Sequence, residues 1–174
     1  MFSTSVLSVS EARQTMLAEL VPVSDSETVP LHQALGRVLK SSVCATLDIP
    51  PFDNSAMDGY AVLAADVATA TADNPVKLPV AEDIPAGRTD LLTLAPGTAH
   101  RIMTGAMLPA GATAVVQVEA TDGATDVVSI YSAVPEGRSI RRAGEDVTAG
   151  MTVLSAGEVL SPAALGLAAA LGLR

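Results

Sequence analysis

Apolar residues recur at helical spacing near the start of the chain. The positions that share one helical face are Val9, Ala12, Met16, Leu17 and Leu20. Ser8 directly precedes this pattern and Glu11 follows Ser8 by three residues, which is the spacing of a capping box. Pro22 ends the pattern. The spacing predicts a helix over residues 9–20.

Two further helices are predicted from their end signals. Pro30, followed six residues later by Gly36, indicates a short helix, because Pro suits the first turn and Gly suits the C-cap. Near the other end of the chain, Ser161 is a typical N-cap and Pro162 fits the first helical position. We therefore expect a final helix that begins there and stops near Gly172.

The middle of the chain changes to short β-rich runs separated by turn clusters. These runs are residues 60–63, 76–80, 98–103, 114–119 and 127–131. Further strands are expected over residues 38–43 and 151–154. Several short strands at this spacing predict a small β-barrel or a curled sheet. The fold class expected from the pattern is mainly β with a few helices (α+β).

Composition narrows the classes of partner. The 174 residues carry a net charge of −9 and only 2% aromatic side chains, so the core must be aliphatic. Phosphate backbones are bound by Lys and Arg, and single strands also need aromatic platforms. We therefore expect that the protein does not bind nucleic acid.

Cysteine and hydropathy bear on the compartment. Cys44 is the only cysteine, so no internal disulfide or cysteine-based zinc cluster can form. No basic region followed by an apolar run opens the sequence, and the apolar run over residues 163–173 is too short to cross a bilayer. We expect a soluble, cytoplasmic protein without a membrane partner.

The least repetitive stretch, residues 48–60, is here named the signature loop. Two prolines stiffen it, and Asp53 and Asp58 place two carboxylates within six residues. Gly59 offers a position where the chain can take positive φ and reverse. One interpretation is a site. The other is an ordinary tight turn that opens a strand at Tyr60, and local chemistry alone favours the turn.

Residues 101–106 form a second candidate, here named the Thr-Gly turn. Thr104 and Gly105 follow an expected strand, and a hydroxyl followed by Gly allows backbone N–H groups to converge on an anion. A Thr-Gly pair after a strand is also a very common simple turn. The pattern by itself favours that second interpretation.

Residues 138–146, here named the Arg-acid segment, form the third candidate. Arg138, Arg141 and Arg142 stand within five positions of an otherwise acidic protein, beside Glu145 and Asp146. Arginine presents a fork suited to phosphate or another oxyanion. A solvated loop with weak ion pairs is an equally good interpretation.

Histidine supplies no further candidate. His32 and His100 are far apart in sequence and lack partners at metal-ligand spacing. The pattern around His100 favours an exposed or hydrogen-bonded side chain.

Residues 50–61 read Pro-Pro-Phe-Asp-Asn-Ser-Ala-Met-Asp-Gly-Tyr-Ala. This run resembles, almost letter for letter, the signature of the MoeA family of molybdopterin molybdenumtransferases, whose eukaryotic relative is the E domain of gephyrin. The Arg-Ile-Met-Thr-Gly-Ala run over 101–106 and the Arg-Arg-x-Gly-Glu-Asp run over 141–146 also resemble family segments.

The resemblance implies an architecture. It covers the whole chain but only the first part of the family fold: curled or bifurcated β-sheets with an inserted, barrel-like β lobe. It implies an elongated dimerisation lobe from residues 1–51 and 138–174 with the N-terminal helix, and an inserted β-rich lobe over 52–137. The resemblance further implies a C-terminal α/β domain that carries the cofactor-binding cleft, and we expect that domain to lie outside these 174 residues.

The resemblance also implies roles for residues. The catalytic set is Asp58, Thr104 and Asp146; the cofactor-binding set is Gly105, Arg138, Arg141 and Arg142; and the metal ligands are Asp58 and Asp146. Carboxylates of this kind hold Mg²⁺ alongside substrate phosphates. Asp58 ranks above Asp53, for which an Asx-type turn is the better interpretation.

The implied activity is molybdenum cofactor biosynthesis: insertion of molybdate into adenylylated molybdopterin with Mg²⁺, releasing AMP. The implied partners are a second copy in a homodimer, the small-molecule pterin and other proteins of this biosynthesis. We expect the 174 residues alone to be inactive. Two alternatives stay open: a non-catalytic dimerisation and interaction scaffold, and a free-standing Mg²⁺-dependent phosphate-ester hydrolase. The second is disfavoured because no single motif carries a dense set of metal ligands.

Overall fold

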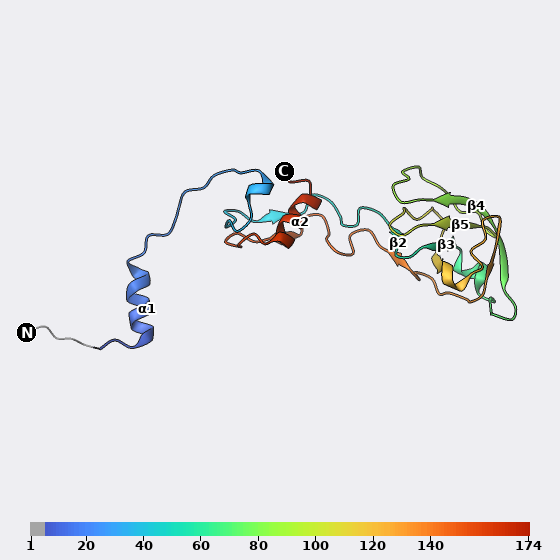
Figure 1. Cartoon of the computed structure of the whole chain (residues 1–174), viewed down its shortest axis with the longest axis horizontal. Coiled ribbons are helices and arrows are strands. Elements are labelled where there is room, and N and C mark those ends of the chain that lie inside the picture. The colour runs from blue at the N-terminus through green and yellow to red at the C-terminus, as the bar shows by residue number, and fades with distance from the viewer. Residues whose placement is uncertain (1–5) are drawn as a thin grey trace, which may run out of the picture.

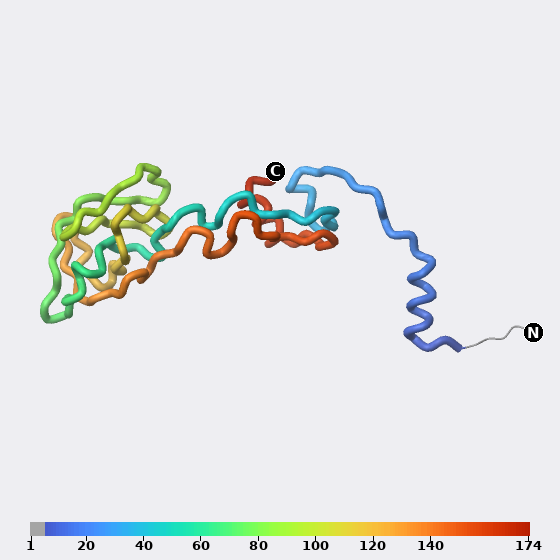
Figure 2. The backbone as a smooth tube through the Cα atoms, turned by 180° about the vertical axis from the view of Figure 1, so that it is seen from behind, coloured from blue at the N-terminus to red at the C-terminus, as the bar shows by residue number. Residues whose placement is uncertain are grey.

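The computed structural model describes residues 6–174, so the first five residues of the predicted dimerisation lobe lie outside the described part. From the N-terminus, the chain runs through an isolated helix and a small lobe with the second helix, and then into a β-rich lobe (Figure 1). Figure 2 shows two segments, in cyan and orange, side by side between the lobes.

Helix α1 (Val9–Ala18) confirms the predicted N-terminal helix, although it ends two residues earlier than expected. Ser8 Oγ accepts a hydrogen bond from the Glu11 amide at 3.2 Å, and the Ser8 amide donates to Glu11 Oε2 at 2.8 Å, which is the expected capping box. No α1 residue is buried. The apolar face, with Val9 89% and Met16 66% exposed, is therefore not covered by any of residues 6–174.

The small lobe combines one 3-10 turn, one strand pair and one helix: η1 (Leu31–Gln33), β1 (Val43–Cys44), β9 (Thr152–Leu154) and α2 (Pro162–Ala170). Its core is aliphatic and consists of Ala34, Leu154, Leu160, Ala164 and Ala168. Helix α2 starts as predicted, because Ser161 Oγ accepts from the Ala164 amide at 3.2 Å. Gly172 follows the helix at φ +83°, a conformation that glycine adopts without strain.

Two predicted elements of this lobe were wrong in extent. The helix expected from Pro30 to Gly36 is only the 3-10 turn η1. The strand expected over residues 38–43 begins at Val43, and Val38 forms a single isolated bridge with Val159. A continuous ladder does not form because this stretch meets residues 157–160 through separate hydrogen bonds, such as that from the Leu39 amide to the Glu158 carbonyl at 2.9 Å.

Two antiparallel segments, residues 43–55 and 140–154, connect the lobes. They pair as β1 with β9 at the small-lobe end, through an Ile49–Val147 bridge in the middle, and as β2 (Asn54–Ser55) with β8 (Ile140–Arg141) at the other end. The signature loop and the Arg-acid segment therefore enter the β-rich lobe beside one another.

The β-rich lobe is a five-stranded sheet in the order β6-β3-β5-β4-β7. Its strands are β3 (Gly59–Val62), β4 (Val76–Ile84), β5 (Ala99–Ile102), β6 (Ala114–Gln117) and β7 (Val127–Ile130), with 3-10 turns η2 (Ala64–Val67) and η3 (Val118–Ala120). Only β4 and β5 run parallel. The Tyr131 amide donates to the Ala120 carbonyl at 3.0 Å, so the end of β7 meets the chain just after β6. The sheet is thus curled, and the predicted fold class is confirmed.

Both faces of this sheet are apolar. On one face Tyr60, Val116 and Ile130 are fully buried, and on the other Ile102 and Val115 are fully buried. Burying each such aliphatic side chain contributes about 1.5–3 kcal/mol. The aliphatic core expected from the composition therefore forms around the strands that carry the candidate site.

Candidate functional site

The signature loop is hydrogen-bonded on both sides to the other two candidate segments. On one side, the Gly105 amide donates to the Ser55 carbonyl at 2.8 Å, and the Ser55 amide donates to the Ala106 carbonyl at 3.0 Å. On the other side, the Ala56 amide donates to the Ser139 carbonyl at 2.9 Å. Segments separated by 50 to 83 residues in sequence are therefore neighbours in one continuous backbone network.

Asp58 and Thr104 form the most direct contact between predicted site residues. Asp58 Oδ1 accepts from both the amide and the hydroxyl of Thr104, each at 2.7 Å. These bonds hold the pKa of the Asp58 carboxyl below its ordinary value, the amide being the larger cause, the hydroxyl the second and the nearby charge of Arg101 a further one. Asp58 is exposed, so an ionised carboxylate is held at the surface in a fixed orientation.

Gly105 and Gly59 are required for different reasons. Gly105 has φ +80° and forms the turn that directs the Thr104 amide. Gly59 was expected to provide positive φ, but it lies outside the left-handed region. A Cβ at Gly59 would instead lie 1.9 Å from the Val116 carbonyl oxygen, so the residue is glycine because the β6 backbone passes too close for any side chain.

Within the Arg-acid segment, Arg141 binds its own acidic neighbours. Its Nε donates to Glu145 Oε1 at 2.9 Å and its Nη2 to Asp146 Oδ2 at 2.6 Å. The Arg142 amide donates to Glu145 Oε2 at 2.8 Å. The Arg141 contact, followed by the amide contact, lowers the pKa of the Glu145 carboxyl. The fork of Arg141 is thus largely used to orient two carboxylates.

Asp53 does not form the local Asx-type turn that sequence reasoning favoured. Its Oδ1 accepts from the Ala143 amide at 2.8 Å and its Oδ2 from Arg142 Nη1 at 2.5 Å. The Ala143 amide is the main cause that lowers the pKa of Asp53, and Arg142 adds to it. No sequence signal indicates this contact, because its partners are 89 and 90 residues away.

The remaining predicted residues are not all gathered at one point. Within residues 6–174, no hydrogen bond joins Asp146 to Asp58 or Thr104. Arg138, unlike Arg141 and Arg142, lines a hollow of about 230 Å³ beside β6. Its side chain makes no hydrogen bond or ion pair with the part of the chain that the structure describes.

The carboxylates of the candidate site do not by themselves form a Mg²⁺ site. Across the described residues, no group of three His, Cys, Asp or Glu side chains could hold a metal ion. Asp58 and Asp146 are each engaged with a neighbour, Thr104 and Arg141 respectively. Residues 6–174 therefore do not fit a Mg²⁺ site made from protein ligands alone.

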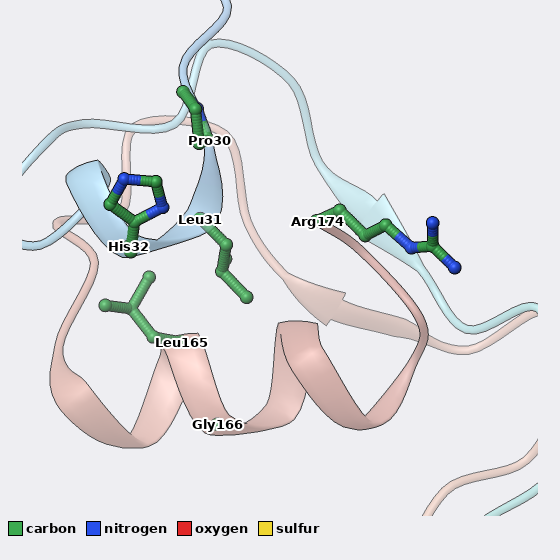
Figure 3. A pocket seen from close by; sticks show the side chains of 6 residues that line it. All are labelled: Pro30, Leu31, His32, Leu165, Gly166 and Arg174. Carbon is green, nitrogen blue, oxygen red and sulfur yellow. The ribbon is translucent and has the colours of Figure 1, made fainter.

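A second hollow, of about 630 Å³, lies in the small lobe. Pro30, Leu31, His32, Leu165, Gly166 and Arg174 line it. Figure 3 shows the Leu31 and Leu165 side chains between η1 and α2, with the Arg174 side chain pointing away from them. None of the predicted site residues lines this apolar hollow.

His100 corrects another expectation. It was interpreted as exposed or hydrogen-bonded, but it is 3% exposed, and its buried Nδ1 has no hydrogen-bond partner among the described residues. Burial is the main cause that lowers its pKa, opposed by the charge of Glu82. Strand β5 is covered on both faces, so alternation in sequence did not reveal which side chains reach solvent.

Comparison with known proteins identifies the family. The family profile described as MoeA N-terminal region (domain I and II) matches residues 7–172. Molybdopterin molybdenumtransferase 2 of Mycobacterium tuberculosis is 61% identical over 163 residues, which cover 94% of this chain and 40% of the relative. Molybdopterin molybdenumtransferase of Synechococcus elongatus is 41% identical over 170 residues, or 97% and 42% of the two chains.

A solved structure agrees with the sequence matches. The molybdopterin biosynthesis MoeA protein of Pyrococcus horikoshii OT3 superposes with a TM-score of 0.88 at 38% identity, covering 95% of this chain and 44% of that one. The chain thus spans about 40% of the length of the curated relatives quoted above. No helix built by residues 6–174 has the length and apolarity needed to cross a bilayer. Because the profile matches residues 7–172, nearly the whole of the chain, the chain belongs to the MoeA N-terminal region family.

Proposed function

We propose that this chain supplies the Asp58–Thr104 part of a site at which molybdate is inserted into adenylylated molybdopterin, with release of AMP. The observation that carries the proposal is the orientation of the Asp58 carboxylate by two hydrogen bonds from Thr104 on a loop that both neighbouring segments hold in place. The relatives named molybdopterin molybdenumtransferase support the reaction class.

The geometry supports a specific division of roles. Asp58 is ionised and exposed, and only Oδ1 receives hydrogen bonds from the described residues, so Oδ2 can orient water or accept a proton near a phosphate. Thr104 positions this carboxylate. The guanidinium groups of Arg141 and Arg142 are paired with Glu145, Asp146 and Asp53, so their part in this proposal is to orient those acids. Mg²⁺ enters no step of this proposal.

The substrate-side half of the site is proposed to come from outside these residues. The chain spans about 40% of the relatives, and its conspicuous polar cluster lies on an exposed surface. Substrate sites usually enclose most of their ligand. We infer that residues 1–174 alone do not turn over, and that a homodimer or a further domain is needed to close the site.

A second candidate function is a non-catalytic module for assembly. The uncovered apolar face of α1 favours it, because Val9, Met16 and Leu17 are more than half exposed. On this view the small lobe and α1 build an oligomer, and the signature loop is a rigid turn.

A chimera tests both candidates. Residues 7–172 replace the matching region of Molybdopterin molybdenumtransferase 2 from Mycobacterium tuberculosis, which is 61% identical. The assay measures molybdate-dependent release of AMP from adenylylated molybdopterin. We expect the unmodified chimera to be active and Asp58→Asn to lower kcat at least 100-fold, with folding and oligomeric state retained.

Asp66→Asn provides the matched control. Asp66 also accepts a backbone amide, that of Gly97 at 2.7 Å, but it lies in η2, outside the three candidate segments. Its loss should leave kcat within twofold. An active Asp58→Asn chimera, or one whose only defect is failure to associate, would contradict the catalytic proposal and favour the assembly module.

A further inference from the structure

We propose that Asp53 is a positioning residue that fixes the Arg-acid segment beside the Asp58–Thr104 pair. The proposal rests on the proposed function, because it assigns a task to Asp53 in that site. It differs from the roles expected for the signature loop, in which Asp53 was a turn residue. The contacts that carry the proposal are made by the two carboxylate oxygens and the backbone carbonyl of Asp53.

Asp53 bonds at once to the Arg-acid segment and to the chain that follows the Thr-Gly turn. Its carboxylate holds the Arg-acid segment, with Oδ1 accepting from the Ala143 amide at 2.8 Å and Oδ2 from Arg142 Nη1 at 2.5 Å. Its backbone carbonyl accepts from the Leu108 amide at 2.9 Å, four residues after Thr104. Asp53 thereby links the Arg-acid segment to the chain two residues after the Thr-Gly turn.

The constraint extends from Arg142 to Asp146. The Glu145 amide donates to the Arg142 carbonyl at 3.2 Å, and the Arg142 amide donates to Glu145 Oε2 at 2.8 Å, which closes a tight turn. Glu145 Oε1 accepts from Arg141 Nε, and Arg141 Nη2 donates to Asp146 Oδ2 at 2.6 Å. Fixing Arg142 and Ala143 therefore limits where the Asp146 carboxylate can lie.

The alternative is an ion pair that only adds stability. The side chains of Asp53 and Arg142 are 36% and 58% exposed, and pairs at such positions contribute little to global stability. The hydrogen bond to the Ala143 amide, in contrast, controls a local backbone position. The proposal therefore predicts a local effect on residues 141–146 that exceeds any effect on the unfolding midpoint.

Amide hydrogen exchange on the 174-residue chain is the first test. Asp53→Ala should speed exchange of the Ala143 amide at least tenfold while the Gly97 amide, which donates to Asp66, stays unchanged. Asp66→Ala should give the reverse pattern. Arg142→Gln serves if Asp53→Ala fails to fold, and should speed exchange over residues 141–146 to a smaller extent, because the bond from Ala143 remains. Unchanged exchange at Ala143 in folded Asp53→Ala would overturn the proposal.

The chimera described above tests positioning against a merely structural role. Asp53→Ala should lower kcat about tenfold or more with KM changed less than threefold, whereas Asp66→Ala should change neither beyond twofold. A wild-type kcat for Asp53→Ala would overturn the positioning role. If the unmodified chimera is inactive, the proposed function fails, and the exchange pattern still decides whether Asp53 holds the Arg-acid segment.

Discussion

Asp58 Oδ1 accepts two hydrogen bonds of 2.7 Å from Thr104, although the two residues are 46 positions apart. The register of the sheet explains this contact. Gly59 on β3 pairs with Ile102 on β5, so the residue before Gly59 and the turn after Ile102 meet at the same end of the sheet. The orientation of the carboxylate is thus set by strand pairing and then fixed by Thr104.

Removing the Thr104 hydroxyl should change the charge behaviour of Asp58. In Thr104→Val the hydroxyl bond is lost and the amide bond remains, so the pKa of Asp58 should rise towards its ordinary value without reaching it. The pKa is measured by carboxyl ¹³C NMR titration. Thr69→Val, at an exposed position outside the site, is the control. An unchanged Asp58 pKa in Thr104→Val would show that the hydroxyl bond is not formed in solution.

Gly59→Ala should destabilise the β-rich lobe severely. The added methyl would overlap the Val116 carbonyl oxygen at 1.9 Å, so strands β3 and β6 would have to separate. We expect a loss of about 3 kcal/mol or more in the free energy of unfolding, measured with urea. Gly87→Ala is a useful comparison because nothing lies near its Cβ and its cost comes from positive φ alone. Equal losses in the two variants would contradict the close approach at Gly59.

Stability should fall on mild acidification because of His100. Its pKa is lowered in the folded state, so below about pH 6.5, the ordinary histidine value, the unfolded chain binds a proton that the folded chain resists. The free energy of unfolding should therefore decrease from pH 7.5 to pH 5.5. His100→Leu should flatten this slope, whereas the exposed His32→Gln should preserve it. A slope that His100→Leu leaves intact would assign it to other groups.

The carboxylates of the candidate site should affect the free energy of unfolding at lower pH than His100 does. The pKa values of Asp53, Asp58 and Glu145 are lowered by hydrogen bonds in the folded state. Their contributions are complete above the unfolded pKa values of about 4 and disappear as the pH falls through the folded values. The two windows can therefore be separated in one titration of stability.

Deleting residues 1–18 should leave the rest of the chain as stable as before. Helix α1 buries no residue, and a ten-residue helix without tertiary contacts is marginal in water despite its capping box. We expect the free energy of unfolding to change by less than about 0.5 kcal/mol, measured with urea. A loss of more than about 1 kcal/mol would mean that α1 docks elsewhere in solution.

Local patterns predicted the elements whose signals lie within a few residues. The capping box at Ser8 and Glu11 and the N-cap at Ser161 form as expected, since each joins atoms three residues apart. The β-rich runs became β3 to β7 with ends shifted by a few residues, except β4, which continues four residues further to Ile84. The stretch at 38–43 failed because its pairing depends on residues 157–160, which its own pattern does not describe.

The site could be predicted only as three separate segments. The family signature pointed to Asp58 and Thr104, but no spacing rule could indicate that Asp53 binds Ala143 or that Arg141 turns towards Glu145 and Asp146. The requirement at Gly59 was predicted for the wrong reason, because the distance between β3 and β6 is a property of the assembled sheet.

The long sequence separation of these contacts has a consequence for how the chain acquires its site. The bonds from Asp58 to Thr104 and from Asp53 to Ala143 close loops of 46 and 90 residues, and such contacts carry an entropic cost that local contacts do not. Peptides that contain only residues 48–60 will therefore lack the arrangement. During refolding, the Thr104 and Ala143 amides should be among the last to become protected from hydrogen exchange. These two amides therefore report when the site has finished folding.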